Sequence, residues 1–162
     1  MKIENIIRRV LREEQEEQIL KIPGFRFFNN DWNILQKFLE SQGNTKCSMV
    51  GDMDLRNTDI KSLGNLVRVE GELNLMSCKN LVSLGGLEYV GGDLSLYFCQ
   101  NLETLGNLNY VGESLYLDAD YIKTLESLGD LQYVGGRLYW EGCDYNTKEV
   151  EEVVWVRNQL YL

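Results

Sequence analysis

The stretch VGGDLSLYFCQNLETLGNLNY, from Val90 to Tyr110, is one of four consecutive units of similar sequence. The other complete units begin at Val50, Val69 and Val111, and a partial unit begins at Val134. Successive units start 19, 21, 21 and 23 residues apart. Repeats of this length are typical of solenoids, in which no single unit can bury its apolar residues and stacked units share one core.

The units share the consensus V-x-G-x-L-x-L-x-x-C-x-x-L-x-x-L-G-x-L-x-Y. Its L-x-L part alternates with period two, which predicts one strand per unit with two inward residues. The expected inward pairs are Met53/Leu55, Leu73/Leu75, Leu94/Leu96, Leu115/Leu117 and Leu138/Trp140. The later leucines recur every three residues, which favours tight turns over a long helix. The recurring glycines Gly64, Gly85, Gly106 and Gly129 predict corners with positive φ.

This pattern resembles leucine-rich repeats, and the V-x-G-x-L-x-L strand with its leucine-spaced return looks like the receptor L-domain type of repeat. The resemblance covers about residues 48–143. It implies an α+β protein built on a short right-handed solenoid of the leucine-rich or β-helix-like type. The solenoid would have four to five turns of about 21 residues and be capped by N- and C-terminal helices. Such solenoids mostly bind macromolecules through a sheet face, and the family brings no catalytic residues.

We therefore divide the chain into an N-terminal helical segment and cap (residues 1–46), the repeat solenoid (residues 47–143) and a C-terminal capping helix (residues 144–162). An apolar stripe that starts at Ile3 predicts a helix over residues 3–20. Phe25, Phe27 and Phe28 read as a short strand-like piece.

Two further helices are expected at the ends of the solenoid. Residues 31–41 form the first, which Asn30 or Asp31 can cap, and residues 147–161 form the second, which Asn146 or Thr147 can cap. Trp32, Leu35, Phe38 and Leu39 lie on one side of the first helix. Val150, Val153, Val154 and Leu160 or Tyr161 would cover the last turn of the solenoid.

The net charge of the chain limits the kinds of partner that it could bind. The chain carries 16 basic and 25 acidic residues, a net charge of −9, and the repeat region holds most of the excess. An acidic surface repels phosphate, so nucleic acid is a poor partner and basic protein surfaces or cations fit better. The alternative is that the acidic residues only keep the protein soluble. No apolar run is long enough for a membrane helix, and no secretory signal is recognisable. We therefore expect a cytoplasmic or virus-associated protein.

Four cysteines raise the question of disulfides or metal. The position after L-x-L-x-x holds Thr58, Cys78, Cys99, Asp120 and Cys143, so three of the four cysteines share one inward column. One reading is a redox pair or metal site, and the other is a column of buried thiols. The chain has no histidine and no C-x-x-C motif, which favours buried thiols and no metal.

The outward positions of the strands form the predicted binding face. Its members are Met76, Tyr97, Tyr116, Asp118, Arg137, Tyr139 and Glu141, with an acidic part made of Asp52, Asp54, Glu72 and Asp93. Tyrosine is enriched in binding hot spots, although strands favour tyrosine for their own stability too. A second column, Tyr89, Tyr110 and Tyr133, follows Arg68 and predicts structural stacking.

We expect a non-catalytic module that binds a protein partner through this face. General acid–base catalysis most often uses histidine, which is absent, and the glycines do not form a phosphate loop, so no cofactor or small-molecule substrate is expected. The alternative is a structural or assembly protein docked through its N-terminal helix, or one that self-assembles. The opening MKIENIIRRVLREEQ is similar to the starts of some tailed-bacteriophage proteins, which suggests a virion component.

Overall fold

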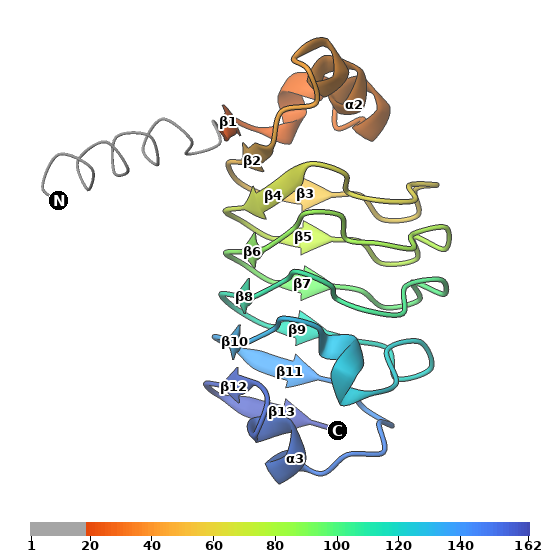
Figure 1. Ribbon diagram of the computed structural model, residues 1–162, viewed down its shortest axis with the longest axis vertical. Coiled ribbons are helices and arrows are strands. Elements are labelled where there is room, and N and C mark those ends of the chain that lie inside the picture. The colour runs from red at the N-terminus through yellow and green to blue at the C-terminus, as the bar shows by residue number, and fades with distance from the viewer. Residues whose placement is uncertain (1–18) are drawn as a thin grey trace, which may run out of the picture.

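The computed structural model describes residues 19–162. The predicted helix over residues 3–20 lies almost wholly outside the described residues, and its last residue, Leu20, begins strand β1 (Leu20–Ile22) instead. The described chain winds into a β-solenoid of about five turns (Figure 1). The solenoid prediction is therefore confirmed.

Two parallel sheets run along the solenoid; each turn contributes one strand to each of them, except that β1 adds a strand to the larger sheet alone. The seven-stranded sheet is ordered β1 (Leu20–Ile22), β2 (Cys47–Met49), β4 (Leu66–Val69), β6 (Tyr89–Val90), β8 (Tyr110–Val111), β10 (Tyr133–Val134), β12 (Trp155–Val156). The six-stranded sheet is ordered β13 (Gln159–Tyr161), β11 (Arg137–Tyr139), β9 (Leu115–Tyr116), β7 (Leu94–Ser95), β5 (Leu73–Asn74), β3 (Met53–Asp54). Figure 1 shows the strands of the two sheets stacked along the long axis of the molecule.

The repeat therefore holds two short strands where the sequence predicted one. In each regular turn the Tyr-Val pair ends the first strand, and the L-x-L pair begins the second after a glycine-containing bend. The bend is packed so closely that a Cβ on Gly112 would collide with the carbonyl oxygen of Gly91. A Cβ on Gly135 would collide with the carbonyl oxygen of Gly112 in the same way. Glycine lets neighbouring backbones approach this closely at the corner between the sheets.

The buried side chains of the core form columns that run along the solenoid from turn to turn. The predicted inward pairs from Met53/Leu55 to Leu138/Trp140 are all buried, with side-chain exposure of 2% or less. The leucines of the return segments fill the rest of the core, together with the valine that ends each strand of the larger sheet. The four corner glycines have φ of 54°, 62°, 57° and 59°, as the sequence predicted.

The N-terminal cap contains the predicted helix. Helix α2 (Trp32–Ser41) is capped by Asp31, whose carboxylate accepts a hydrogen bond from the Asn33 backbone at 2.8 Å. Trp32, Leu35 and Leu39 are buried against the solenoid core. Residues Phe25–Phe28 form the 3₁₀ helix η1 rather than the strand-like piece expected.

The C-terminal segment differs most from expectation. The helix predicted over residues 147–161 is only α3 (Thr147–Glu151), which a capping box between Asn146 and Glu149 begins. The chain then adds β12 and β13 to the two sheets, so this segment makes a further turn. Val150 and Val154 are buried as predicted, whereas Val153 is exposed. Tertiary pairing overrides the helical spacing of these valines, which are poor helix formers.

The fourth unit carries the longest insertion. Its extra residues form the 3₁₀ helix η2 (Leu125–Leu128), which Thr124 caps by accepting a hydrogen bond from the Ser127 backbone. In the same unit Asp120 is exposed, and Ala119 packs against the core instead. The prediction that Asp120 points inward is therefore wrong, because a shorter turn shifts the chain by one position there.

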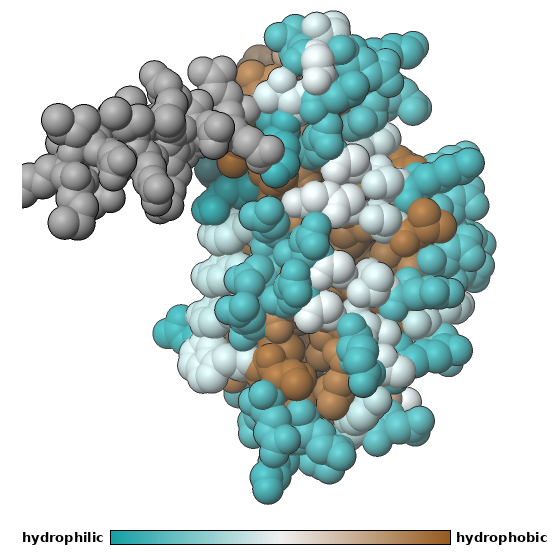
Figure 2. All heavy atoms as spheres, in the orientation of Figure 1, coloured by the Kyte–Doolittle hydropathy of each residue, from teal (hydrophilic) through white to brown (hydrophobic). Residues whose placement is uncertain are grey.

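Among residues 19–162, no helix is long and apolar enough to span a bilayer. Figure 2 shows one side of the solenoid, where hydrophobic patches lie over the middle and the C-terminal turns among polar surface.

Candidate functional site

A row of tyrosine rings runs along the outer side of the six-stranded sheet. Strand pairing puts Tyr116, Tyr139 and Tyr161 at equivalent positions in successive turns. Their ring centroids are 4.7 and 4.6 Å apart, and each pair of rings lies within 6° of parallel. We call these three residues and Tyr97 the tyrosine face. Tyr161 was not predicted here, because its segment was read as a helix.

Tyr97 joins the row from a neighbouring column. It lies two residues beyond Ser95, the residue that pairs with Tyr116, so its ring meets Tyr116 obliquely at 5.8 Å and 53°. Phe98 follows it with an exposed ring and a positive φ of 61°. The structure therefore brings the three predicted tyrosines together and extends the aromatic surface at both ends.

Charged groups flank the tyrosines. The Arg137 guanidinium donates a hydrogen bond to the Tyr139 hydroxyl at 3.3 Å. Partial burial and the nearby Glu141 carboxylate raise the pKa of Tyr97, with a smaller contribution from Asp118. Met76 occupies the position equivalent to Tyr97 in the preceding turn, where the Ser77 backbone donates to the Tyr97 carbonyl. All seven residues of the predicted binding face thus belong to one surface.

The predicted acidic part of this face is largely occupied with structural bonds. Asp52 accepts a hydrogen bond from the Glu72 backbone at 2.8 Å, and Asp93 accepts one from the Ser114 backbone at 2.6 Å. Both bonds join one turn to the next. Asp54 forms an ion pair with Arg56 at 2.7 Å, and the hydrogen bond from Arg56 lowers the pKa of Asp54. Glu72 is exposed and accepts a hydrogen bond from the Asn74 amide at 3.5 Å within its own strand segment.

The cysteine column is a set of free thiols. The Cys78 thiol donates to the Leu55 carbonyl at 3.0 Å, and the Cys99 thiol donates to the Leu75 carbonyl at 3.2 Å. Burial raises the pKa of Cys99 to about 12. Within the described residues, no group of three or more Cys, Asp or Glu side chains is placed to hold a metal ion. These thiols therefore satisfy backbone carbonyls in the core.

A second aromatic ladder runs along the seven-stranded sheet. Tyr89, Tyr110 and Tyr133 stack with centroids 4.7 Å apart, and the Arg68 guanidinium lies 3.5 Å above the Tyr89 ring. Trp155 extends the ladder at 5.0 Å and is 56% exposed. The predicted stacking is confirmed, and Trp155 was missed because its strand was not foreseen.

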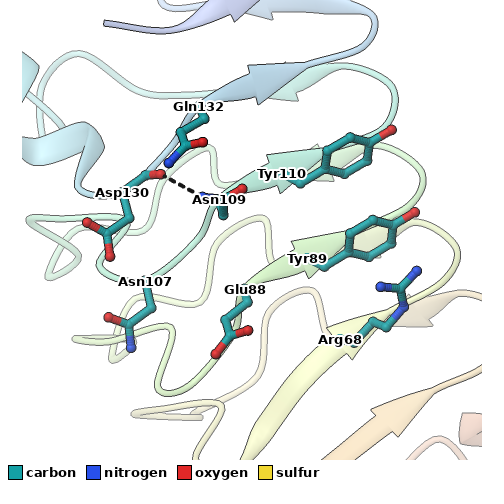
Figure 3. Close-up of a pocket in the computed structure, with 8 residues that line it drawn as sticks. All are labelled: Arg68, Glu88, Tyr89, Asn107, Asn109, Tyr110, Asp130 and Gln132. Atoms are coloured by element: carbon teal, nitrogen blue, oxygen red, sulfur yellow. Dashed lines mark hydrogen bonds between the residues drawn. The ribbon is translucent and has the colours of Figure 1, made fainter.

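An open polar groove lies beside this ladder and crosses the middle turns. It has a volume of about 690 Å³ and is lined by Arg68, Glu88, Tyr89, Asn107, Asn109, Tyr110, Asp130 and Gln132. Figure 3 shows the two tyrosines side by side, with Asn109 and Gln132 on neighbouring turns. We call it the amide groove. Sequence reasoning did not single it out, although a polar residue precedes the tyrosine in each of these units.

No protein-family model, curated protein or solved structure matches this chain.

Proposed function

We propose that the protein is a non-catalytic binding module that holds a protein partner on the tyrosine face. The observation that carries the proposal is a row of half-buried tyrosine rings on a parallel sheet, flanked by Arg137, Asp118 and Glu141. Tyrosine offers a large apolar body and a polar tip, and tyrosine and arginine are enriched among hot-spot residues.

The tyrosine face is rigid before any partner arrives. Each ring of Tyr139 and Tyr116 already contacts neighbouring rings, and the strands beneath are paired on both sides. Fixing a side chain on binding costs about 0.5–1.5 kcal/mol, so rings that are already fixed lower the cost of association. This rigidity distinguishes the face from an ordinary row of surface residues.

The charge of the face suggests the chemistry of the partner. Asp118 accepts hydrogen bonds from the Phe98 and Asp120 backbones, but neither Asp118 nor Glu141 forms an ion pair within residues 19–162, and the repeat region has an acidic excess. A basic protein surface would complement these carboxylates and be steered toward them at low ionic strength. We expect the interaction to weaken as salt is raised.

The test is affinity capture from host cells with the wild-type chain and with Tyr116→Ala/Tyr139→Ala. Partners held by the tyrosine face should be recovered with the wild type and lost with the double variant. Tyr121→Ala is the matched control, because Tyr121 is half-buried but makes no ring contact in the described chain. Equal recovery with all three proteins would exclude this face.

The relation to leucine-rich or receptor L-domain-like repeats is part of the same proposal. It is supported by the L-x-L-x-x-C pattern and by thiols that bond to backbone carbonyls at that position. Proteins of that type mostly act as binding surfaces, which agrees with a non-enzymatic, protein-binding role.

The second candidate is an assembly protein, such as a bacteriophage virion component, docked through residues 1–18. It is favoured by the apolar stripe that begins at Ile3 and by the phage-like opening sequence. Size-exclusion chromatography with light scattering separates the two proposals. An oligomer that becomes monomeric when residues 1–18 are removed supports assembly, whereas two monomers leave the tyrosine face as the leading proposal.

A further inference from the structure

The amide groove has an unusual lining for a cavity of its size. All eight lining side chains end in a planar hydrogen-bonding group: an amide, a carboxylate, a phenol or a guanidinium. Small-molecule pockets are mostly lined by apolar and aromatic side chains with a few polar groups. A lining without any aliphatic side chain therefore indicates a ligand that is itself covered with hydrogen-bonding groups.

Most of the hydrogen-bonding capacity in the groove is unused. Among the described residues, Asn109 has the one side-chain hydrogen bond of this lining, a donation to the Asp130 carbonyl at 3.3 Å. Arg68 stacks its guanidinium on the Tyr89 ring, 3.5 Å from the ring centroid. Arg68 forms no ion pair with any of residues 19–162. The groove is thus provided with donors and acceptors that the fold itself does not need.

The polar groups follow the spacing of the turns. Asn109 donates from its backbone to the Glu88 carbonyl, and Gln132 donates to the Asn109 carbonyl, each at 2.9 Å. These three residues therefore occupy equivalent positions on successive turns, about 4.8 Å apart. An elongated ligand that lies along the solenoid axis meets one carboxylate or amide on every turn.

We propose that the amide groove binds a neutral oligosaccharide lying along the solenoid axis. Sugars carry hydroxyl groups in adjacent pairs, and an amide or carboxylate can satisfy two such groups at once. The volume of about 690 Å³ falls within the range of small-molecule sites. This site is separate from the tyrosine face and does not depend on the function proposed there.

Other ligand classes fit the groove less well. A peptide gains much of its affinity from apolar side chains, for which the lining offers no aliphatic contact. A nucleic acid would meet the carboxylates of Glu88 and Asp130 with Arg68 as the one cation of the lining. The faces of the tyrosine rings are covered by one another, so the rings offer the sugar only their edges. The affinity therefore comes mainly from hydrogen bonds and is weak.

Saturation-transfer NMR on the full chain tests the proposal, because it detects weak binding. The probes are tetrasaccharides of glucose, mannose, galactose and N-acetylglucosamine at millimolar concentration. We expect transfer to at least one of them, and binding weakened about tenfold or more in Asn107→Ala/Gln132→Ala, which removes two free amides. Neither side chain is hydrogen-bonded in the described chain, so this variant keeps the fold.

The control is Asn158→Ala/Gln159→Ala, which removes two exposed amides at the last turn, outside the groove. This variant should bind the sugar as the wild type does, and so should Tyr116→Ala/Tyr139→Ala. Absence of transfer to all four sugars overturns the proposal, as does equal binding by the groove variant. Binding of a hexa-aspartate peptide in place of the sugars would also overturn it and make the groove a polypeptide site.

Discussion

The rings of Tyr89 and Tyr110 lie face to face, with centroids 4.7 Å apart and planes 1° from parallel. This distance equals the separation of neighbouring strands in a sheet, about 4.7–4.9 Å. The pitch of the solenoid therefore sets the stacking distance, and any planar side chain at this position in every turn will stack without adjustment of the backbone.

Removing the central ring of this ladder should destabilise the protein. Tyr110→Ala breaks two stacked pairs, and each aromatic pair contributes about 0.5–1.5 kcal/mol beyond its buried area. We expect the free energy of unfolding to fall by about 2–3 kcal/mol in urea titrations. Tyr110→Phe, which keeps the ring, should lose less than half as much. Equal losses in the two variants would contradict a stabilising role for stacking.

The glycine column between the sheets should tolerate no side chain. A Cβ at Gly112 collides with the Gly91 carbonyl oxygen, so we expect Gly112→Ala to cost about 3 kcal/mol or more. Gly106 is the matched control: a Cβ there has no neighbour within 4 Å, although φ is +57°. Gly106→Ala should therefore cost about 1 kcal/mol from backbone strain alone. Denaturant unfolding of the two variants measures the difference, and similar losses would contradict the packing described.

Buried thiols should make stability depend on alkaline pH. Burial raises the pKa of Cys47 to about 11 and that of Cys99 to about 12 in the folded protein. The same thiols ionise near pH 8.5–9 when unfolded, so the unfolded state loses protons first as pH rises. Stability is therefore complete below this range and falls above it, by about 1 kcal/mol per thiol between pH 9 and 10.

The two cysteines can be tested directly by substitution. Cys47→Ala/Cys99→Ala lowers stability at every pH because it leaves cavities, but it should flatten the fall in unfolding free energy between pH 9 and 10. The measurement is urea unfolding at a series of pH values. An unchanged slope in the double variant would assign the alkaline loss to other groups.

Two carboxylates on the same sheet face should respond differently to substitution. Asp93 accepts a hydrogen bond from the Ser114 backbone at 2.6 Å, so Asp93→Ala should cost about 1–2 kcal/mol of stability. Glu141 is exposed and has no hydrogen bond or ion pair within residues 19–162, so Glu141→Ala should change stability by less than about 0.5 kcal/mol. Thermal unfolding distinguishes them. A large loss for Glu141→Ala would show that it has a structural role.

Much of the fold was predictable because it repeats. The inward pairs, the corner glycines and the stacked tyrosines each recur in several units. A structural role assigned to a position in one unit can therefore be checked against the same position in the next unit. Helix α2 was predictable for a different reason, since Asp31 caps it and Trp32, Leu35 and Leu39 mark its buried side.

The errors arose where local pattern and long-range pairing disagree. Val69, Gly71 and Leu73 keep period two across the bend, so alternation alone could not show that the strand divides there. Val150, Val153 and Val154 match helical spacing, but the strand after them pairs with β10, one turn earlier in the solenoid. The sequence contains no local signal for such a partner.

The candidate surfaces were predictable to a different extent. Tyr97, Tyr116 and Tyr139 were found because outward positions of a strand can be read from its inward ones. Tyr161 was not found, because its segment was predicted to be a helix. The amide groove was not found, because its lining side chains, such as Asn107 and Gln132, lie at exposed polar positions that the alternation of the strands does not mark as a site.

The parallel sheets also determine how the molecule would respond to force. Their interstrand hydrogen bonds connect each turn only to the turns above and below it, so they point along the solenoid axis. A pull on the two ends of the solenoid would load these bonds a few at a time and peel off one turn after another. A pull along the strands would shear all bonds of a turn together. The protein should therefore be mechanically weak along its length and much stronger across it.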